Sequence, residues 1–325
     1  MPEPVLEPDL PIIDSHHHLW DGTPWVPDSR TYLVPELLAD LQSGHRIEAT
    51  VFVEAHAMYR AAGPEEMRPV GEVEFANRVA AMSASGRYGR PGICAGIIGH
   101  ADLLLGERVD LVLEALSRAG GHRLRGIRYM AATDPTVYPS PRPPGLLLDP
   151  RFRAGYSRLA AFGLSFDAWV HHPQLDDVVD LARRFPDTPI IVNHAGGPLR
   201  IGYHASRLAE AHTEWAGAAE RLARCPNIAM KLGGLGMRYL GFPTRESGER
   251  TSTVLATEWR PYIEPLIQAF SPARCMFESN FPVDRRTCSY RILWNTFKHL
   301  AAGYSKSEKS ALFKDTAARV YRLEL

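Results

Sequence analysis

The sequence predicts an α/β protein in which a single domain, spanning residues 1–325, forms a (β/α)8 TIM barrel. Short apolar, β-branched runs alternate along the chain with segments of helical periodicity, and this alternation favours a parallel sheet. There are eight such runs, and eight repeats of the unit predict a closed barrel. The length of 325 residues also suits one barrel. An open doubly wound sheet is the alternative, but no G-x-G-x-x-G pattern follows the first run.

Each predicted strand is a short run of residues that favour extended structure, bounded by turn residues. The strands are expected at 12–14, 49–55, 93–99, 124–130, 164–170, 189–195, 228–234 and 275–281. The helices are expected at 35–43, 71–85, 106–119, 149–162, 174–185, 205–224, 257–270, 289–302 and 305–321. Asp149-Pro150 and the pair Ser305 and Glu308 are start signals for two of these helices. Residues 1–10 precede the first strand as an N-terminal extension.

Two segments are longer and less regular than ordinary connections. Residues 133–148 contain five prolines, and residues 234–256 contain no strong periodic pattern until their end. Long loops in a compact domain are usually functional. Both segments follow strands, so in a barrel both rise on the catalytic face. We expect walls or lids over a pocket, with oligomer contacts or disordered insertions as the alternative.

Composition and charge exclude several classes of partner. The 37 basic and 37 acidic side chains give a net charge of zero, which disfavours nucleic acid and membrane surfaces. No apolar run approaches the roughly 18 residues of a membrane-spanning helix, and the N-terminus lacks the pattern of a secretory signal. The four cysteines are scattered without a C-x-x-C pair, so we expect buried thiols in the cytoplasm. The expected partner is a small-molecule substrate, with a homo-oligomer also compatible with the sequence.

The first strand leads into three consecutive histidines, in the stretch IIDSHHHLWD at 12–21. Side chains of a strand alternate between its faces, so His16 and His18 point the same way and His17 points the opposite way. A D-x-H-x-H pattern therefore places two imidazoles side by side at a strand end. The alternative is a set of capped loop histidines with no chemical role.

Polar side chains also gather at the ends of the other predicted strands, where a barrel carries its chemistry. A single histidine on a core strand is usually structural, but ionisable groups at six or more strand ends need a reason, because their burial costs free energy. Besides His16 and His18, these residues are Glu54, His56, His100, Asp102, Arg128, Tyr129, Asp167, Trp169, His171, His172, Asn193, His194, Lys231, Glu278, Asn280 and Asp284.

Four motifs in this order resemble the amidohydrolase superfamily, namely PIIDSHHHLWD, VHHPQL, IVNHAGGP and FESNFPVD. The resemblance covers residues 10–322 and is strongest to the amidohydrolase-2 branch, which includes 2-pyrone-4,6-dicarboxylate lactonase and sugar-acid lactonases. It implies that His16 and His18 match the family's strand-one pair and that His194 matches a later strand histidine. The family's last strand reads S-D-[WF]-P, and Asn280 stands at the position of that aspartate.

An amide neither takes a proton from water nor ligates a metal well, so Asn280 departs from the family's chemistry. Three carboxylates are candidates for the missing role: Glu278 on the same strand, Asp284 just beyond it, and Glu54 at the end of strand two. For Glu278 the alternative is a buried partner of Lys231 or of an arginine, since buried charges are normally paired.

A metal is compatible with this set but is not required by it. His16, His18, His194 and one carboxylate would make a catalytic zinc or manganese site with an open position for water. The lactonase relatives, however, include enzymes thought to act without a metal, in which histidines bind the substrate carbonyl. Both alternatives stay open: one divalent metal, Zn or Mn, or no cofactor.

The leading hypothesis is a hydrolase of a small cyclic ester or related carbonyl compound that carries a carboxylate. The predicted catalytic residues are His16, His18, His194, Glu278 and Glu54. Arg128 is expected to bind an acidic group of the substrate, or else to form an ion pair with Asp167 or Glu54. The other predicted substrate contacts are Asn280, His172, Trp169 and Asp284. The alternatives are a metal-dependent decarboxylase of an aromatic or unsaturated acid and a catalytically silent ligand-binding barrel.

Overall fold

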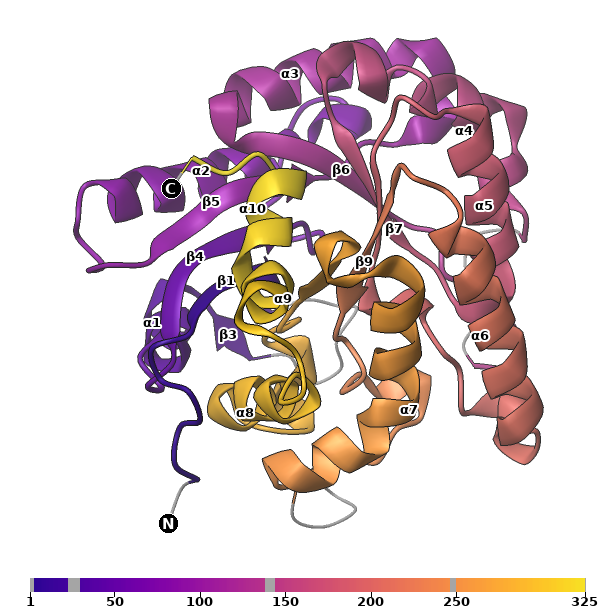
Figure 1. The fold of residues 1–325 in the computed structure, drawn as a ribbon. Helices are drawn as coiled ribbons and strands as arrows, with labels where there is room; N and C mark the ends of the chain where they lie inside the picture. The colour runs from indigo at the N-terminus through magenta and orange to yellow at the C-terminus, as the bar shows by residue number, and fades with distance from the viewer. Residues whose placement is uncertain (1–2, 23–29, 138–143, 246–249, 325) are drawn as a thin grey trace.

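The computed structural model describes residues 3–22, 30–137, 144–245 and 250–324. Its main sheet has eight parallel strands whose order in space is their order in the chain, so the predicted barrel is confirmed and the doubly wound alternative is wrong (Figure 1). The strands are β1 (Pro11–His17), β4 (Arg46–Val53), β5 (Gly92–Gly99), β6 (Leu124–Met130), β7 (Ser165–Trp169), β8 (Ile190–Val192), β9 (Ile228–Leu232) and β10 (Cys275–Phe277).

The barrel closes between its first and last strands, just beyond the end of β10. The backbone N–H of Asn280 donates to the carbonyl of His16, and the N–H of His18 donates to the carbonyl of Phe281, both at 2.8 Å. This closure therefore runs through residues predicted to belong to the site.

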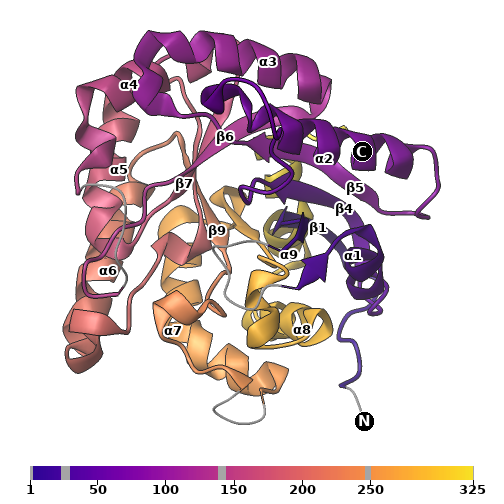
Figure 2. The ribbon, with the colours of Figure 1, turned by 180° about the vertical axis from the view of Figure 1, so that it is seen from behind.

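In the described part of the chain, ten α-helices cover the outside of the barrel or follow its last strand (Figures 1 and 2). They are α1 (Val34–Leu41), α2 (Val70–Ala84), α3 (Asp110–Gly120), α4 (Pro150–Tyr156), α5 (Leu175–Arg184), α6 (Leu208–Ala223), α7 (Ser252–Phe270), α8 (Tyr290–Leu300), α9 (Lys306–Ser310) and α10 (Thr316–Val320). Asp149 caps α4, and Ser305 with Glu308 forms a capping box at α9, as their positions in the sequence suggested. Within the described ranges, no helix is both long enough and apolar enough to cross a membrane.

Several boundaries differ from the prediction. The first strand continues to His17, because that residue pairs with Phe52 of β4. Helix α7 begins at Ser252 rather than at 257, because the Thr251 side chain accepts a hydrogen bond from the backbone N–H of Val254 and caps the helix. The predicted helix 305–321 is divided into α9 and α10 by a π-helical turn.

A two-stranded ribbon that the sequence did not predict follows β1. Strand β2 (Trp20–Asp21) pairs antiparallel with β3 (Thr31–Tyr32). Strands of two residues are too short for a periodic pattern to show. The ribbon matters for the site because the Trp20 ring stacks on His18, with ring centroids 5.6 Å apart.

The apolar core has two layers. The larger lies between the sheet and the helices, and a smaller cluster fills the barrel interior. Tyr321, just after α10, is fully buried in that interior cluster together with residues such as Ile13 and Val51. The C-terminal segment thus enters the barrel, and Figure 1 shows α10 lying across one end of the strands.

Candidate active site

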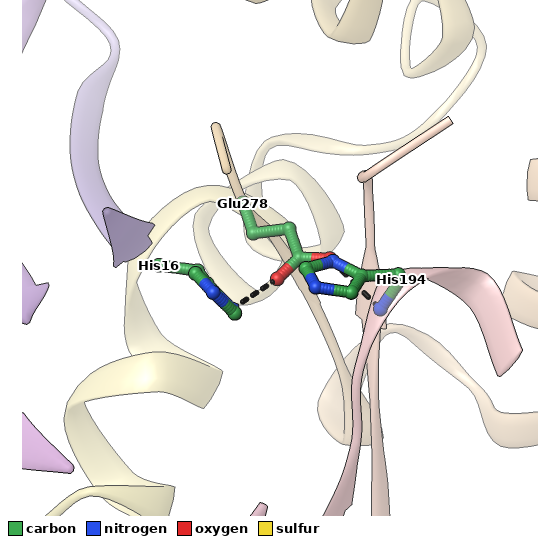
Figure 3. A group of neighbouring side chains, drawn as sticks. All are labelled: His16, His194 and Glu278. Atoms are coloured by element: carbon green, nitrogen blue, oxygen red, sulfur yellow. Dashed lines mark hydrogen bonds and ion pairs between the residues drawn. The ribbon is translucent and has the colours of Figure 1, made fainter. Parts of the chain in front are cut away.

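A buried trio of side chains from β1, β8 and β10, or from just beyond these strands, forms the centre of the site (Figure 3). Glu278 Oε1 accepts hydrogen bonds from the backbone N–H of His194 at 2.9 Å and from its Nδ1 at 2.8 Å. The other oxygen, Oε2, lies 2.9 Å from His16 Nδ1. All three side chains are at most 2% exposed. One carboxylate therefore contacts imidazoles from two different parts of the barrel.

The three consecutive histidines divide between the two faces of β1. His17 points toward Thr50, with 2.8 Å between its Nε2 and the threonine hydroxyl. His16 and His18 point the other way, and their Nε2 atoms lie 3.2 Å apart. His18 Nδ1 is 2.8 Å from the carbonyl oxygen of Val53. Because a carbonyl only accepts, this nitrogen carries the proton, and a neutral His18 has its lone pair on Nε2.

Lys231 supports His16 from inside the barrel. Its Nζ is 3.2 Å from His16 Nδ1 and 3.0 Å from Asp167 Oδ2, which also accepts from the Tyr321 hydroxyl at 2.8 Å. His16 Nδ1 thus lies beside both a hydrogen-bond acceptor, Glu278, and a donor, Lys231. With a proton it donates toward Glu278, and without one it accepts from Lys231.

Burial controls the protonation of this centre. It lowers the pKa of His16 and His18 well below the ordinary histidine value. Burial also lowers the pKa of His194, against the opposing effect of Glu278. For Glu278 burial alone would raise the pKa, but His194 and Lys231 outweigh it, so the pKa lies below its usual value. The centre consists of neutral imidazoles around an ionised carboxylate.

A second polar group lies beside the first, around Arg128. Its Nε is 2.7 Å from Glu54 Oε1, so the ion pair foreseen as an alternative for Arg128 is present. Its Nη1 lies 3.4 Å from His16 Nε2, so the guanidinium also borders the histidine pair. Glu54 Oε2 is 3.3 Å from His56 Nε2, and His100 Nδ1 is 3.2 Å from the carbonyl oxygen of Arg128. Burial raises the pKa of Glu54, but Arg128 and the two histidines together lower it to about 2.

Asn280 is engaged by a neighbouring acid. Its Nδ2 donates to Asp284 Oδ1 at 2.8 Å, and the backbone N–H of Gly236 donates to Oδ2 at 3.0 Å. Both side chains are buried. Burial raises the pKa of Asp284 to about 8, so this carboxyl is protonated at neutral pH. A protonated acid is a poor base for water.

The remaining predicted substrate contacts lie in two places. The Trp169 ring packs edge-on against His194, with centroids 4.6 Å apart. His172 instead packs against His204, with centroids 4.7 Å apart, and its Nδ1 accepts from the backbone N–H of Leu199. It also lines a cavity of about 700 Å³ between α5 and α6. A role of His172 in binding substrate stays a prediction.

Both long segments contact these surroundings. Asp134 Oδ2 is 3.2 Å from His204 Nε2, and Gly236 holds Asp284 as described above. The predicted loop 234–256 ends earlier than expected, because 252–256 belong to α7. Residues 138–143 and 246–249 of the two predicted loops lie outside the described residues.

Sequence reasoning missed two supporting tyrosines. Tyr321 reaches Asp167 from the far end of the chain, and the Tyr290 hydroxyl donates to Asp14 Oδ2 at 3.0 Å. Asp14 also accepts from the backbone N–H and hydroxyl of Ser279, at 2.9 and 2.6 Å, and so ties β1 to the segment after β10. These contacts join residues that are more than 150 positions apart in the sequence, so no local sequence pattern predicts them.

Three site residues have a backbone conformation that side chains other than glycine seldom adopt. The φ angles are +56° for His56, +56° for His194 and +53° for Asn280. Each residue lies where the chain leaves a strand and turns. Conformations of this kind gather at functional sites, where the surrounding structure holds them in place.

Comparisons with known proteins agree with this fold. The protein-family model Amidohydro_2, described as amidohydrolase, matches residues 13–323. The chain is 34% identical to the uncharacterized protein y4mH of Sinorhizobium fredii, over 97% of this chain and 99% of the relative. It is 28% identical to an L-fucono-1,5-lactonase of Burkholderia multivorans, over 96% of each. A crystal structure of an amidohydrolase from Burkholderia multivorans with bound zinc superposes with a TM-score of 0.74 at 27% identity, covering 96% of this chain and 99% of that one. The chain therefore belongs to the amidohydrolase family.

Proposed function

We propose that the protein hydrolyses a small cyclic ester, a lactone, that carries a carboxylate. The observation that carries the proposal is the contact of one buried carboxylate, Glu278, with Nδ1 of both His194 and His16. The contact fixes the orientation and protonation of the His194 imidazole at the barrel's catalytic end and places His16 beside it. The similarity to an L-fucono-1,5-lactonase supports the choice of a lactone as substrate.

His194 is the residue we assign as general base. Its Nδ1–H is held by Glu278, so the lone pair of the neutral ring is on Nε2. Nε2 takes a proton from water while the water oxygen adds to the lactone carbonyl carbon. The same nitrogen then returns the proton to the ring oxygen as the C–O bond breaks. Glu278 stabilises the imidazolium that forms between the two steps, in the way that a buried carboxylate supports a catalytic histidine elsewhere.

Glu278 itself is a less suitable base for water than the sequence suggested. Its side chain has no exposed surface, and each of its oxygens faces an imidazole. We therefore assign it to positioning His194 and His16. Glu54 forms an ion pair with Arg128, and Asp284 is protonated at neutral pH, so neither is a suitable base. Of the groups considered, His194 is the one that combines a free lone pair with a fixed orientation.

His16, His18 and Arg128 are assigned to the substrate. His16 Nε2 lies 3.2 Å from His18 Nε2 and 3.4 Å from Arg128 Nη1. We assign polarisation of the carbonyl to His16, whose Nε2 carries the proton when its Nδ1 accepts from Lys231. His18 Nε2, which carries a lone pair, would accept a hydrogen bond from the substrate, and the guanidinium, whose charge is permanent, would recognise the carboxylate. Trp169 covers one side of His194 and would form an apolar wall.

A zinc or manganese ion fits the same histidines. Glu278 Oε2 has no hydrogen bond of good geometry among the described residues, yet it lies 2.9 Å from His16 Nδ1. With the proton of His16 on that Nδ1, His16 and His18 present two lone pairs 3.2 Å apart. Two ligands of a tetrahedral zinc ion, each at about 2.0–2.1 Å, are separated by about 3.3 Å.

In a metal-assisted form of the reaction, His16, His18 and His194 would hold this metal, and the lone pair of His194 would then not serve as the base. Glu278 would be the outer partner of His16 and His194, and the Val53 carbonyl that of His18. A bound ion of this type supplies a Lewis acid and lowers the pKa of its water. The zinc in the related crystal structure supports this part of the proposal. The positive charge of Arg128 does not oppose it strongly, because Glu54 neutralises that charge at 2.7 Å.

The test is an assay of the protein on a panel of carboxylate-bearing lactones, both as isolated and after addition of zinc or manganese. Hydrolysis is measured by the release of protons. We expect hydrolysis of at least one lactone, and a loss of at least about 100-fold in kcat/KM for His194→Ala. His122→Ala, at an exposed position on the outside of the barrel, is the matched control and should retain full activity. A folded protein that hydrolyses no member of the panel under either condition would contradict the proposal. Release of CO2 from aromatic acids instead would identify a decarboxylase.

A further inference from the structure

A second group of metal-ligating side chains lies at the ends of β4 and β5. Glu54, His56 and His100 each place one ligand atom within 4.8 Å of the others. Glu54 Oε2 and His56 Nε2 lie 3.3 Å apart. None of the three belongs to the set His16, His18 and His194, although Arg128 contacts both groups.

We propose that Glu54, His56 and His100 bind a divalent transition metal of the zinc type. Two imidazoles and one carboxylate form a ligand set that suits zinc and leaves a fourth position for water. The 3.3 Å between Glu54 Oε2 and His56 Nε2 already equals the separation of about 3.3 Å expected for two ligands at about 2.0–2.1 Å from a tetrahedral ion. The ligand atom of His100 lies within 4.8 Å of the other two.

Arg128 orients two of the three ligands. His100 Nδ1 lies 3.2 Å from the Arg128 carbonyl oxygen, which only accepts, so Nδ1 carries the proton and the lone pair of the neutral ring is on Nε2. Glu54 Oε1 bonds to Arg128 Nε at 2.7 Å, and Oε2 is the oxygen on the side of His56. Ligands held in this way by outer partners are typical of built metal sites.

Glu72 holds the backbone on either side of His56, the remaining ligand. Its Oε1 accepts from the backbone N–H groups of Ala55 and Ala57, at 2.8 and 3.1 Å, on either side of His56. The chain between these two bonds has the strained φ of +56° at His56. Glu72 is 1% exposed, and its Oε2 has no hydrogen-bond partner among the described residues.

Solvent reaches the His56 ring but not the ligand atoms of His56 and Glu54. The His56 side chain is 15% exposed, whereas its Nε2 and the Glu54 side chain are buried, so an ion would enter on the histidine side. The Tyr59 ring stacks on His56 with centroids 5.7 Å apart, and the Tyr129 ring packs on His100 at 5.3 Å. These aromatic rings form side walls and restrict the rotation of both imidazoles.

Metal titration tests the site without reference to any enzymatic activity. The whole protein is stripped with a chelator, dialysed and titrated with Co²⁺, following the visible absorption of the bound ion, and the metal content of Zn²⁺-loaded protein is counted by mass spectrometry. The variants are His56→Gln with His100→Gln for this site, His18→Ala with His194→Ala for the other centre, and His122→Ala as the surface control. Circular dichroism establishes that each variant is folded.

We expect the His56→Gln/His100→Gln variant to lose one equivalent of bound metal relative to wild type, and His122→Ala to lose none. If wild type binds two equivalents, the His18→Ala/His194→Ala variant should lose the other one. If wild type binds one equivalent that only the His56→Gln/His100→Gln variant loses, this site holds the metal and the metal-assisted form of the proposed hydrolysis fails. Equal metal content in wild type and the His56→Gln/His100→Gln variant, or no metal in wild type, would overturn the proposal.

A further variant gives a new spectroscopic signal, which a variant that merely fails to fold would not produce. His100→Cys replaces an imidazole with a thiolate, which zinc-type metals also bind. This variant should keep the equivalent of metal and add a sulfur-to-cobalt charge-transfer band to the Co²⁺ spectrum. A folded His100→Cys protein that binds Co²⁺ without that band would show that residue 100 does not ligate the ion.

Discussion

Glu278 and Glu54 are both carboxylates with no exposed side-chain surface at the catalytic end of the barrel, but their partners differ. Glu278 contacts two imidazoles whose pKa values burial keeps low, and Glu54 contacts a guanidinium whose charge is permanent. The first can stabilise a charge that appears on His194 during a reaction. Glu54 instead forms an ion pair with the Arg128 guanidinium, which is always charged. Two buried acids in one barrel thus serve different purposes because of what they face.

The largest expected effect is on catalysis, from Glu278→Gln. The amide cannot stabilise an imidazolium on His194, so kcat should fall about 10²–10⁴-fold while the fold is retained. Steady-state kinetics on an accepted lactone would measure the loss. A variant with unchanged kcat would separate Glu278 from the chemistry and leave it a structural role.

For Glu54→Gln the main effect should be on stability. The substitution leaves the buried Arg128 without its countercharge, and breaking a buried pair in this way costs about 3–5 kcal/mol in the free energy of unfolding. Urea denaturation would measure it. The control is Glu74→Gln, which breaks an exposed pair with Arg60 and should cost at most about 1 kcal/mol. Equal costs for both variants would mean that Arg128 is adequately solvated.

A third buried acid, Asp284, sharpens the comparison because its hydrogen-bond partners are uncharged. Its folded pKa of about 8 lies above the unfolded value of about 3.9, so between these pH values the folded state binds more protons. Its contribution to stability is therefore present at low pH and lost as pH rises through about 8. The slope would be at most about 1.4 kcal/mol per pH unit.

Asp284→Asn should remove this part of the pH dependence. Urea midpoints of the variant and of wild type, measured between pH 5 and 8.5, would test it. We expect the wild-type midpoint to fall more steeply with rising pH than that of the variant. Parallel curves would show that Asp284 has an ordinary pKa despite its burial.

The smallest expected effect comes from Tyr321→Phe, which removes one hydroxyl from the support of Lys231. The lost hydrogen bond to the charged Asp167 should cost about 1.5–3 kcal/mol of stability. The ring remains to fill the barrel interior, so the fold should persist. Thermal unfolding would measure the change, and no change would indicate that water replaces the hydroxyl.

The fold was predictable because the alternation of strands and helices is a local property repeated eight times. The strand-end position of His16, His18, His194 and Glu278 followed from the same alternation. What each group faces did not follow. For Arg128 the sequence left a substrate carboxylate, Asp167 or Glu54 as alternatives, and only the folded chain shows that Glu54 is its partner. The boundary of α7 and the contact of Tyr321 with Asp167 depend on capping and on packing between distant segments, which carry no periodic signal.

The hydrogen bonds that close the barrel have a consequence for how the protein is made. They join His16 and His18 to Asn280 and Phe281, so the first and last strands of the barrel meet within the site itself. A ribosome makes Glu278 and Asn280 about 260 residues after the two histidines. Until β10 has been synthesised, β1 is unpaired on one edge and the site is incomplete. Closure of the barrel and assembly of the site then occur in the same event.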